Sequence, residues 1–283
     1  MSRYNPVMPL RAFTLLAIVL PTLAADDANR ALLIDAEQAL AQDRPADALK
    51  LVDQYLATTS NDARAHLLRG AIHDQSKDHA KAISDYTKAL ALDPTLAPAW
   101  QRRGVAHFMA GHIDESIKDF DRYLDLRPDE RPHHWQRGIA LYYAGRYEDG
   151  VKQFELHRTV NPEDVENAVW HFLCLARWKD VETARKSLIP IKDDARIPMS
   201  QVHDLFAGKA TPDDVIKAAT DNPRHLFYAH LYLGLYFEAT KEPEKARRHL
   251  TLAAEKYPVP DYMHGVAKVH VARLSDPKRA PSP

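Results

Sequence analysis

The sequence is poor in cysteine and has almost no net charge, and each shortage excludes a class of function. Cys174 is the single cysteine among 283 residues, so the chain can form neither an internal disulfide nor a multi-cysteine metal site. Lysine and arginine number 38 against 39 aspartate and glutamate residues, a formal net charge of −1. Because a nearly neutral chain has no overall field that attracts nucleic acid or an anionic membrane, we expect neither as a partner.

Catalytic and cofactor-binding motifs are also missing. The sequence has no phosphate-binding loop of the G-x-x-x-x-G-K-[ST] type, no G-x-S-x-G motif and no dinucleotide-binding glycine loop. It has 15 histidines but no H-E-x-x-H motif, and the pair of His171 and Cys174 has no evident third ligand. The sequence therefore predicts a protein that is not an enzyme and that holds no metal or other cofactor.

Long apolar runs are absent after the first 25 residues. Arg3 and Arg11 precede or border an apolar run at 12–20, and small residues follow at Thr22 and Ala24. This pattern predicts a cleaved secretory signal over residues 1–25, since so short a run does not span a bilayer. We expect a periplasmic or secreted protein without strong membrane contact after cleavage. The alternative is a membrane anchor formed by an uncleaved N-terminal segment.

A repeat of 34 residues dominates the rest of the chain. One ladder of glycines and one of prolines keep this spacing: Gly70, Gly104 and Gly138, and Pro94, Pro128 and Pro162. In the unit APAWQRRGVAHFMAGHIDESIKDFDRYLDLRPDE, the glycine falls midway along a first helix. The proline ends a second helix, because the residue before a proline avoids helical geometry. This pattern resembles the tetratricopeptide repeat, a helix hairpin that is stable only when stacked.

The resemblance implies an all-α fold, a right-handed superhelix of tetratricopeptide-type hairpins. We expect repeats over residues 26–190, in units at 29–62, 63–96, 97–130, 131–164 and a degenerate 165–190. The period is lost over 191–226, which we expect to be an irregular insertion of short helices. A sixth repeat at 227–260, a capping helix at 261–275 and a flexible tail at 276–283 complete the predicted organisation.

One stretch, RGIALYYAGR at 137–146, resembles a narrower family, that of the bacterial envelope adaptor new lipoprotein I. The segments at 167–188, 204–219 and 231–250 follow in the same order as in that family. The resemblance implies a homodimeric adaptor that docks peptidoglycan-cleaving enzymes and a processing protease, so envelope peptidases are the implied partners. Members of that family are lipid-anchored, whereas this chain has no cysteine at the cleavage site to carry a lipid.

Aromatic residues gather on one face of the first helix of the fourth unit. Trp135, Ile139, Tyr142 and Tyr143 are spaced i, i+4, i+7 and i+8, so they share a helical face that we expect to line the concave side. Exposed apolar surface of this size usually marks an interface. The predicted partner-binding groove consists of Gln101, Arg102, Val105, Phe108, Met109, Trp135, Ile139, Tyr142, Tyr143, Trp170, Leu173 and Arg177.

Two other interpretations of the aromatic face stay open. The rings can pack locally on the next helix, or they can be covered by the chain's own insertion or by a second subunit. The sequence does not support a clamp for a C-terminal carboxylate, because the places of its lysine and asparagine residues are taken by Leu67, Ala71 and Arg102. Extended or helical peptides with aromatic or aliphatic anchors fit the groove better.

A third ladder has a structural explanation. Arg69, Arg103 and Arg137 keep the 34-residue spacing, and Asp85 and Asp119 fall at the facing place on the second helix of their units. We therefore expect ion pairs within the hairpins. Together these features predict an exported, non-catalytic scaffold that binds peptides or proteins in its groove. The alternative is a structural subunit of a homo-oligomeric envelope assembly.

Overall fold

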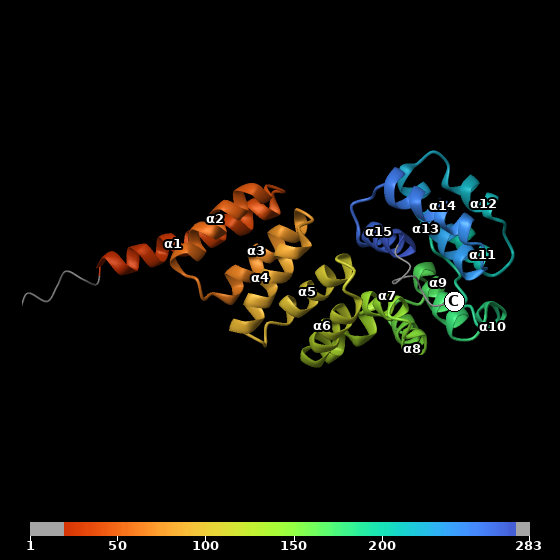
Figure 1. Ribbon diagram of the computed structural model, residues 1–283, viewed down its shortest axis with the longest axis horizontal. Coiled ribbons are helices and arrows are strands. Elements are labelled where there is room, and N and C mark those ends of the chain that lie inside the picture. Colours follow the sequence, from red (N-terminus) through yellow and green to blue (C-terminus); the bar gives the residue numbers. More distant parts are fainter. Residues whose placement is uncertain (1–19, 276–283) are drawn as a thin grey trace, which may run out of the picture.

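The computed structural model describes residues 20–275, with side chains from residue 29 onward, and this part of the chain contains helices but no strand (Figure 1). Most of the predicted signal, residues 1–19, lies outside the described residues. The whole of the predicted tail at 276–283 also lies outside them. The predicted fold class, all-α with stacked tetratricopeptide-type hairpins, is confirmed.

Successive hairpins form the first two thirds of the molecule (Figure 1). They are α1 (Leu20–Ala41) with α2 (Pro45–Thr58), α3 (Ala63–Gln75) with α4 (His79–Leu92), α5 (Ala97–Met109) with α6 (Ile113–Leu126), α7 (Trp135–Tyr143) with α8 (Tyr147–Arg158), and α9 (Val165–Trp178) with the short α10 (Val181–Lys186). A 3-10 helix, η1 (Pro128–His133), precedes α7, so the fourth unit starts its α-helix later than a regular repeat does.

The chain then folds back on itself. The helices of this second part are α11 (Met199–Phe206), α12 (Pro212–Ala219), α13 (Pro223–Ala239), α14 (Pro243–Thr251), the π-helical turn η2 (Leu252–Lys256) and α15 (Tyr262–Ser275). Thr211 caps α12 in a capping box with Asp214. In Figure 1, α13 lies beside α9 and α15 beside α5 and α7, while α1 to α4 extend away as an arm.

Close helix contact in the hairpins α3–α4, α5–α6 and α7–α8 depends on the glycine ladder. A Cβ atom added at Gly104 or Gly138 would lie 2.6 Å from the ring of Phe120 or Phe154 on the facing helix. Gly70 faces Tyr86 in the same way. These rings are buried and cannot move aside, so only glycine lets the helices approach this closely.

The arginine ladder ties each hairpin to itself and to the one before it. The predicted pairs are confirmed: Nε of Arg69 lies 2.9 Å from Oδ2 of Asp85, and Nε of Arg103 lies 2.8 Å from Oδ2 of Asp119. Each arginine also reaches the second helix of the preceding unit, 16 residues earlier, in the bonds from Arg69 to Asp53, Arg103 to Thr87 and Arg137 to Asp121. The ladder therefore holds the hairpins in register.

The glycine contacts lead to a stability prediction. Replacing Gly104 with alanine raises helix propensity by about 1 kcal/mol, but the new methyl overlaps the buried Phe120 ring, so we expect a net loss of about 1–3 kcal/mol in the free energy of unfolding. Urea unfolding monitored by circular dichroism measures this loss in the free energy of unfolding.

The matched control is Gly265→Ala in α15. There the added methyl meets only the flexible end of the Met109 side chain, which can swing away. We expect this variant to stay close to the wild type. A Gly104→Ala protein as stable as Gly265→Ala would contradict this explanation of the glycine ladder.

Candidate functional site

The predicted aromatic groove is not an open surface. Six of its residues are buried, and none of them is more than 5% exposed: Phe108, Ile139, Tyr142, Tyr143, Trp170 and Leu173. The expectation that these side chains face solvent is therefore wrong. The chain itself covers them, as one of the open interpretations allowed, and the covering contacts come from Glu238 on α13 and from Tyr262 and His270 on α15, which follow the predicted 191–226 insertion.

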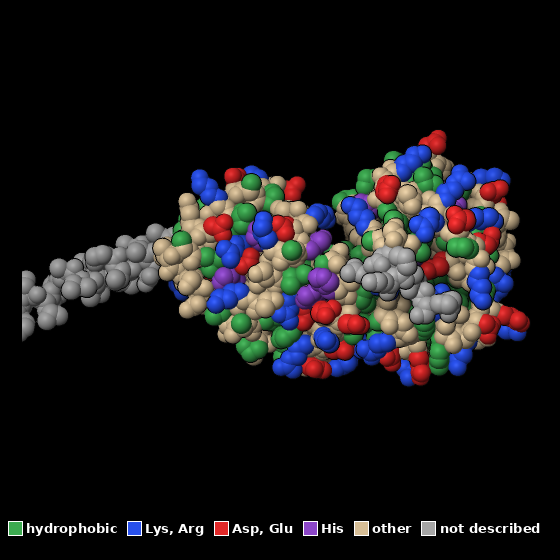
Figure 2. Space-filling view, viewed as in Figure 1, with side chains coloured by type: hydrophobic (Ala, Val, Ile, Leu, Met, Phe, Trp, Pro, Cys, Tyr) green, Lys and Arg blue, Asp and Glu red, His purple; other side chains and the backbone are tan. Residues whose placement is uncertain are grey.

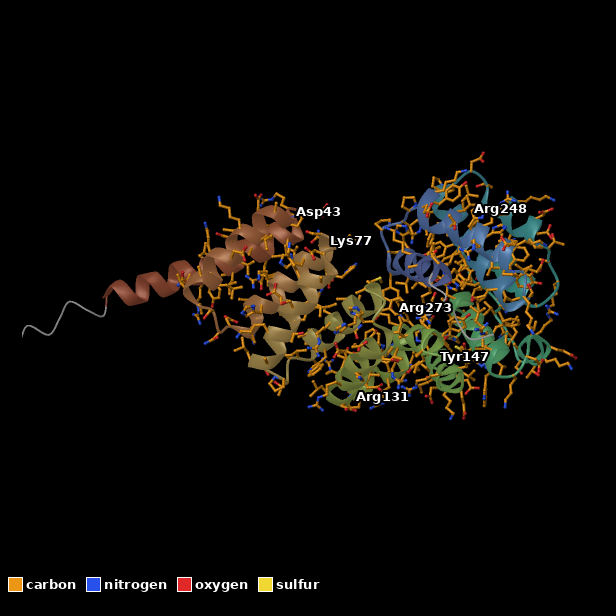
Figure 3. All side chains as sticks on the ribbon, in the orientation of Figure 1. Asp43, Lys77, Arg131, Tyr147, Arg248 and Arg273 are labelled. Atoms are coloured by element: carbon orange, nitrogen blue, oxygen red, sulfur yellow. The ribbon has the colours of Figure 1, made fainter. Side chains whose placement is uncertain are left out.

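Tyr262, at the start of α15, makes the central covering contact. Its ring stacks on Phe108 at a centroid distance of 5.6 Å and meets Trp135 edge-on at 5.0 Å. Further along α15, Nη2 of Arg273 donates to the backbone carbonyl of Tyr143 at 2.9 Å. Figure 3 places Arg273 where α15 faces the fourth repeat. The C-terminal helix thus closes the concave side of the superhelix at this point.

A buried group of polar side chains links α15 to α7 and α13. His270, only 1% exposed, has its Nδ1 2.9 Å from the Tyr143 hydroxyl and its Nε2 3.3 Å from Oε2 of Glu238 on α13. The Tyr142 hydroxyl donates to the same carboxylate oxygen at 3.2 Å. Burial acts to raise the pKa of Glu238, but His270, Arg177 and the Tyr142 hydroxyl outweigh it, so the pKa lies below its ordinary value. We call Tyr143, Glu238 and His270 the latch.

The other predicted groove residues have mixed surroundings. Gln101 joins two repeats, because its Oε1 accepts from His134 at 2.6 Å and its Nε2 donates to Gln136 at 2.7 Å. Arg177 donates to the Tyr147 hydroxyl at 3.3 Å and lies over that ring. Arg102 is exposed, and three residues are partly buried: Val105, Met109 and Trp135.

A cavity of 590 Å³ remains beneath the cover, between α7, α8 and α9 on one side and α13 and α15 on the other. It contains three predicted residues, Trp135, Ile139 and Trp170. The lining residues that sequence reasoning missed include Asp164, Glu166, Asn167, Arg196, Arg224, Tyr228, Asp261 and Tyr262. The only sequence signal for them was the i, i+3 spacing of Asn167 and Trp170, which puts both on one face of α9.

Three polar atoms of the lining residues have no hydrogen-bond partner in the described part of the chain. They are Oδ1 of Asn167, Nε1 of Trp170 and the hydroxyl of Tyr262. Asn167 is 3% and Trp170 2% exposed, and burial raises the pKa of Tyr262, so its hydroxyl keeps its proton. Because buried polar groups are nearly always paired, these three atoms call for a partner such as a water molecule or a polar ligand group.

Charged residues surround one end of this cavity. The Arg196 guanidinium contacts the carboxylates of Asp164, Glu166 and Asp194, each at 2.6 Å. Burial raises the pKa of Glu166 although Tyr232 and Arg196 both donate to its carboxylate. Arg224, another lining residue, lies 3.3 Å from Asp261.

The remaining reactive candidates are structural. Cys174 is fully buried and burial raises the pKa of its thiol, which keeps it in the unreactive protonated form. Within residues 20–275, no three His, Cys, Asp or Glu side chains come together in a way that could hold a metal ion. The visible surface mixes charges of both signs without a single dominant patch (Figure 2).

Comparison with known proteins agrees with this architecture. Two family models, each described as tetratricopeptide repeat, match residues 35–97 and 70–134. No curated protein shows significant sequence similarity to the chain. Within the described tetratricopeptide fold, no helix is both long enough and apolar enough to cross a membrane.

Solved structures share the fold at low sequence identity. A tetratricopeptide repeat protein from Parabacteroides merdae superposes with a TM-score of 0.58 at 14% identity, covering 88% of this chain and all of that one. A MamA structure gives 0.53 at 17% identity over 57% of this chain and 88% of its own. MamA from Desulfovibrio magneticus gives 0.53 at 18% identity, over 56% and 90%. These likenesses show the fold alone.

The latch leads to a prediction with a pH dependence. Glu238→Gln leaves the buried His270 without a carboxylate, so we expect a loss of about 2–4 kcal/mol in the free energy of unfolding at pH 7. A carboxyl whose folded pKa is depressed stabilises the fold above its unfolded pKa and loses this contribution as pH falls through the folded pKa. The difference in the free energy of unfolding between wild type and Glu238→Gln should therefore become smaller as the pH drops below 4.5.

The exposed Glu37→Gln change serves as the control for this measurement. Urea unfolding at several pH values distinguishes the two sites. The role of the latch would be contradicted if the loss in the free energy of unfolding caused by Glu238→Gln stayed constant down to pH 3. It would also be contradicted if Glu37→Gln caused an equal loss.

Proposed function

We propose that the protein is an exported, non-catalytic adaptor that binds a segment of another polypeptide in the cavity between α7 to α9 and α13 to α15. Tetratricopeptide repeats act as protein–protein interaction scaffolds, and solenoids of this kind use their concave side for binding. In this chain, α15 covers the aromatic face, so the binding space on that side is reduced to the cavity.

The observation that carries the proposal is the set of partnerless polar atoms. The Trp170 indole can only donate, Asn167 Oδ1 can only accept, and the Tyr262 hydroxyl can do both. A peptide group offers one carbonyl acceptor and one N–H donor, so polypeptide backbone carries the kinds of group that these atoms need. Trp135 and Tyr228 supply apolar wall for a side chain at the same place.

The size of the cavity favours a segment over a folded domain. A volume of 590 Å³ lies within the range of sites that enclose a small molecule or a few residues. A polypeptide segment that enters this space can belong to a much larger protein. This fits an adaptor, which holds its partner by a short motif and leaves the rest of the partner free to act.

Two features of the sequence support a cellular role in the envelope. The signal pattern over 1–25 supports export, and the likeness of 137–146 to the new lipoprotein I family supports recruitment of envelope hydrolases or proteases. The alternative role as a homo-oligomeric subunit relied on the aromatic face for subunit contact. That face is covered by α13 and α15 within one chain, which favours the adaptor.

The proposal is tested by removing one wall of the cavity. Trp135→Ala should weaken partner capture by about 2 kcal/mol, or roughly thirtyfold, because a central aromatic anchor is lost. Affinity purification from the native envelope, quantified by mass spectrometry, measures the capture. Circular dichroism should show unchanged helicity.

Trp178→Ala is the matched control, since Trp178 is 39% exposed and does not line the cavity. Its partner set should equal that of the wild type. Equal recovery of partners by the Trp135→Ala protein, or equal loss in both variants, would contradict binding in this cavity.

A further inference from the structure

We infer that the bound segment carries a lysine or arginine whose cationic group lies at the Asp164 and Glu166 end of the cavity. This inference rests on the proposed function and adds the chemical class of the ligand. It contrasts with a carboxylate clamp, which would select an acidic end.

The charge balance at this end is negative. One guanidinium, that of Arg196, is shared by the carboxylates of Asp164, Glu166 and Asp194. Asp164 and Glu166 line the cavity, and their side chains are 15% and 19% exposed, so water does little to screen them. Three carboxylates on one cation leave an excess of two negative charges.

Neighbouring groups reduce this excess without cancelling it. The first turn of α9 donates to Asp164 through the Glu166 N–H at 3.1 Å and to Asp194 through the Val165 N–H at 3.2 Å. A helix N-terminus contributes roughly half a positive charge. His157 donates from Nδ1 to the Pro132 carbonyl at 2.8 Å, and its Nε2 is 4.0 Å from Asp164. Burial raises the pKa of Glu166, and the charge of the neighbouring Asp164 adds to the rise.

The pair of Arg224 and Asp261 does not compete for a cation. Asp261 is already paired with Arg224 at 3.3 Å and accepts from the Tyr228 hydroxyl at 2.9 Å. That group is balanced, one carboxylate against one guanidinium. A positively charged ligand group is therefore attracted to Asp164 and Glu166 specifically.

The walls suit the stem of a basic side chain. Trp135 presents aromatic surface, which attracts a cation and packs on its methylene groups, whereas the Tyr228 ring already carries the Arg224 guanidinium at 5.5 Å. Oδ1 of Asn167 needs an N–H donor, and Nε1 of Trp170 needs an acceptor, so both can be paired by the backbone next to the basic residue. An acidic side chain would meet like charge and leave the acid cluster unbalanced.

The experiment selects ligands without assuming their sequence. A library of short random peptides with blocked ends is panned on the wild-type protein, and the enriched peptides are sequenced and measured by calorimetry. We expect one enriched lysine or arginine position beside an apolar residue. Glu166→Gln, which keeps an acceptor for the Tyr232 hydroxyl, should weaken these peptides roughly tenfold, as expected for loss of one charged hydrogen bond.

Asp164→Asn provides a second variant, because asparagine keeps the helix cap while removing the charge. Glu148→Gln is the control, since Glu148 is on the exposed face of α8. Thermal unfolding should show all three variants folded. Unchanged affinity of the selected peptides for both Glu166→Gln and Asp164→Asn would overturn the inference.

The outcomes separate this inference from the proposed function. If the enriched peptides are neutral or acidic but bind the Trp135→Ala protein more weakly than the wild type, the adaptor function is supported and the basic ligand is refuted. No enriched peptide at all would refute both. Binding of free n-butylamine as tightly as the selected peptides would show a small-amine site and would overturn the assignment to a polypeptide.

Discussion

The Tyr262 ring packs between Phe108 and Trp135, and this contact determines which surfaces of the solenoid remain available. A regular array of hairpins leaves its concave side open along its whole length. Here the chain returns after α10, and α15 places Tyr262 on the aromatic face of the third and fourth repeats. Each aromatic ring carries about 150–250 Å² of surface, so covering this face removes a large apolar area from water.

The return of the chain depends on irregularity in the fifth unit. Second helices of the regular hairpins α3 to α6 have 14 residues, whereas α10 has six. The shorter helix lets the following loop turn back, and Arg196 of that loop binds the carboxylates at the start of α9. Thus the segment that breaks the repeat also supplies the charged end of the cavity.

The sequence predicted the parts of this structure that depend on local spacing. The glycine ladder and the Arg69 and Arg103 pairs could be found because their partners lie on the adjacent helix, 16 residues away. The aromatic face of α7 was recognised from its helical spacing. Its cover was not, because the partners of Tyr142 and Tyr143 lie 96 and 127 residues along the chain. Contacts between residues so far apart in the sequence leave no periodic pattern that could predict them. The contact between Arg196 and Asp164 likewise follows no repeat spacing.

The central claim is that a polypeptide enters the cavity and pairs with the Trp170 indole. The chain has four tryptophans, so their indole N–H signals can be resolved and assigned in a nitrogen-15 NMR spectrum by single Trp→Phe changes. Addition of a partner segment that binds should shift the indole N–H signals of Trp170 and Trp135 and leave the Trp178 signal unchanged. A partner that shifts Trp178 or Trp100 while Trp170 stays unchanged would contradict the account.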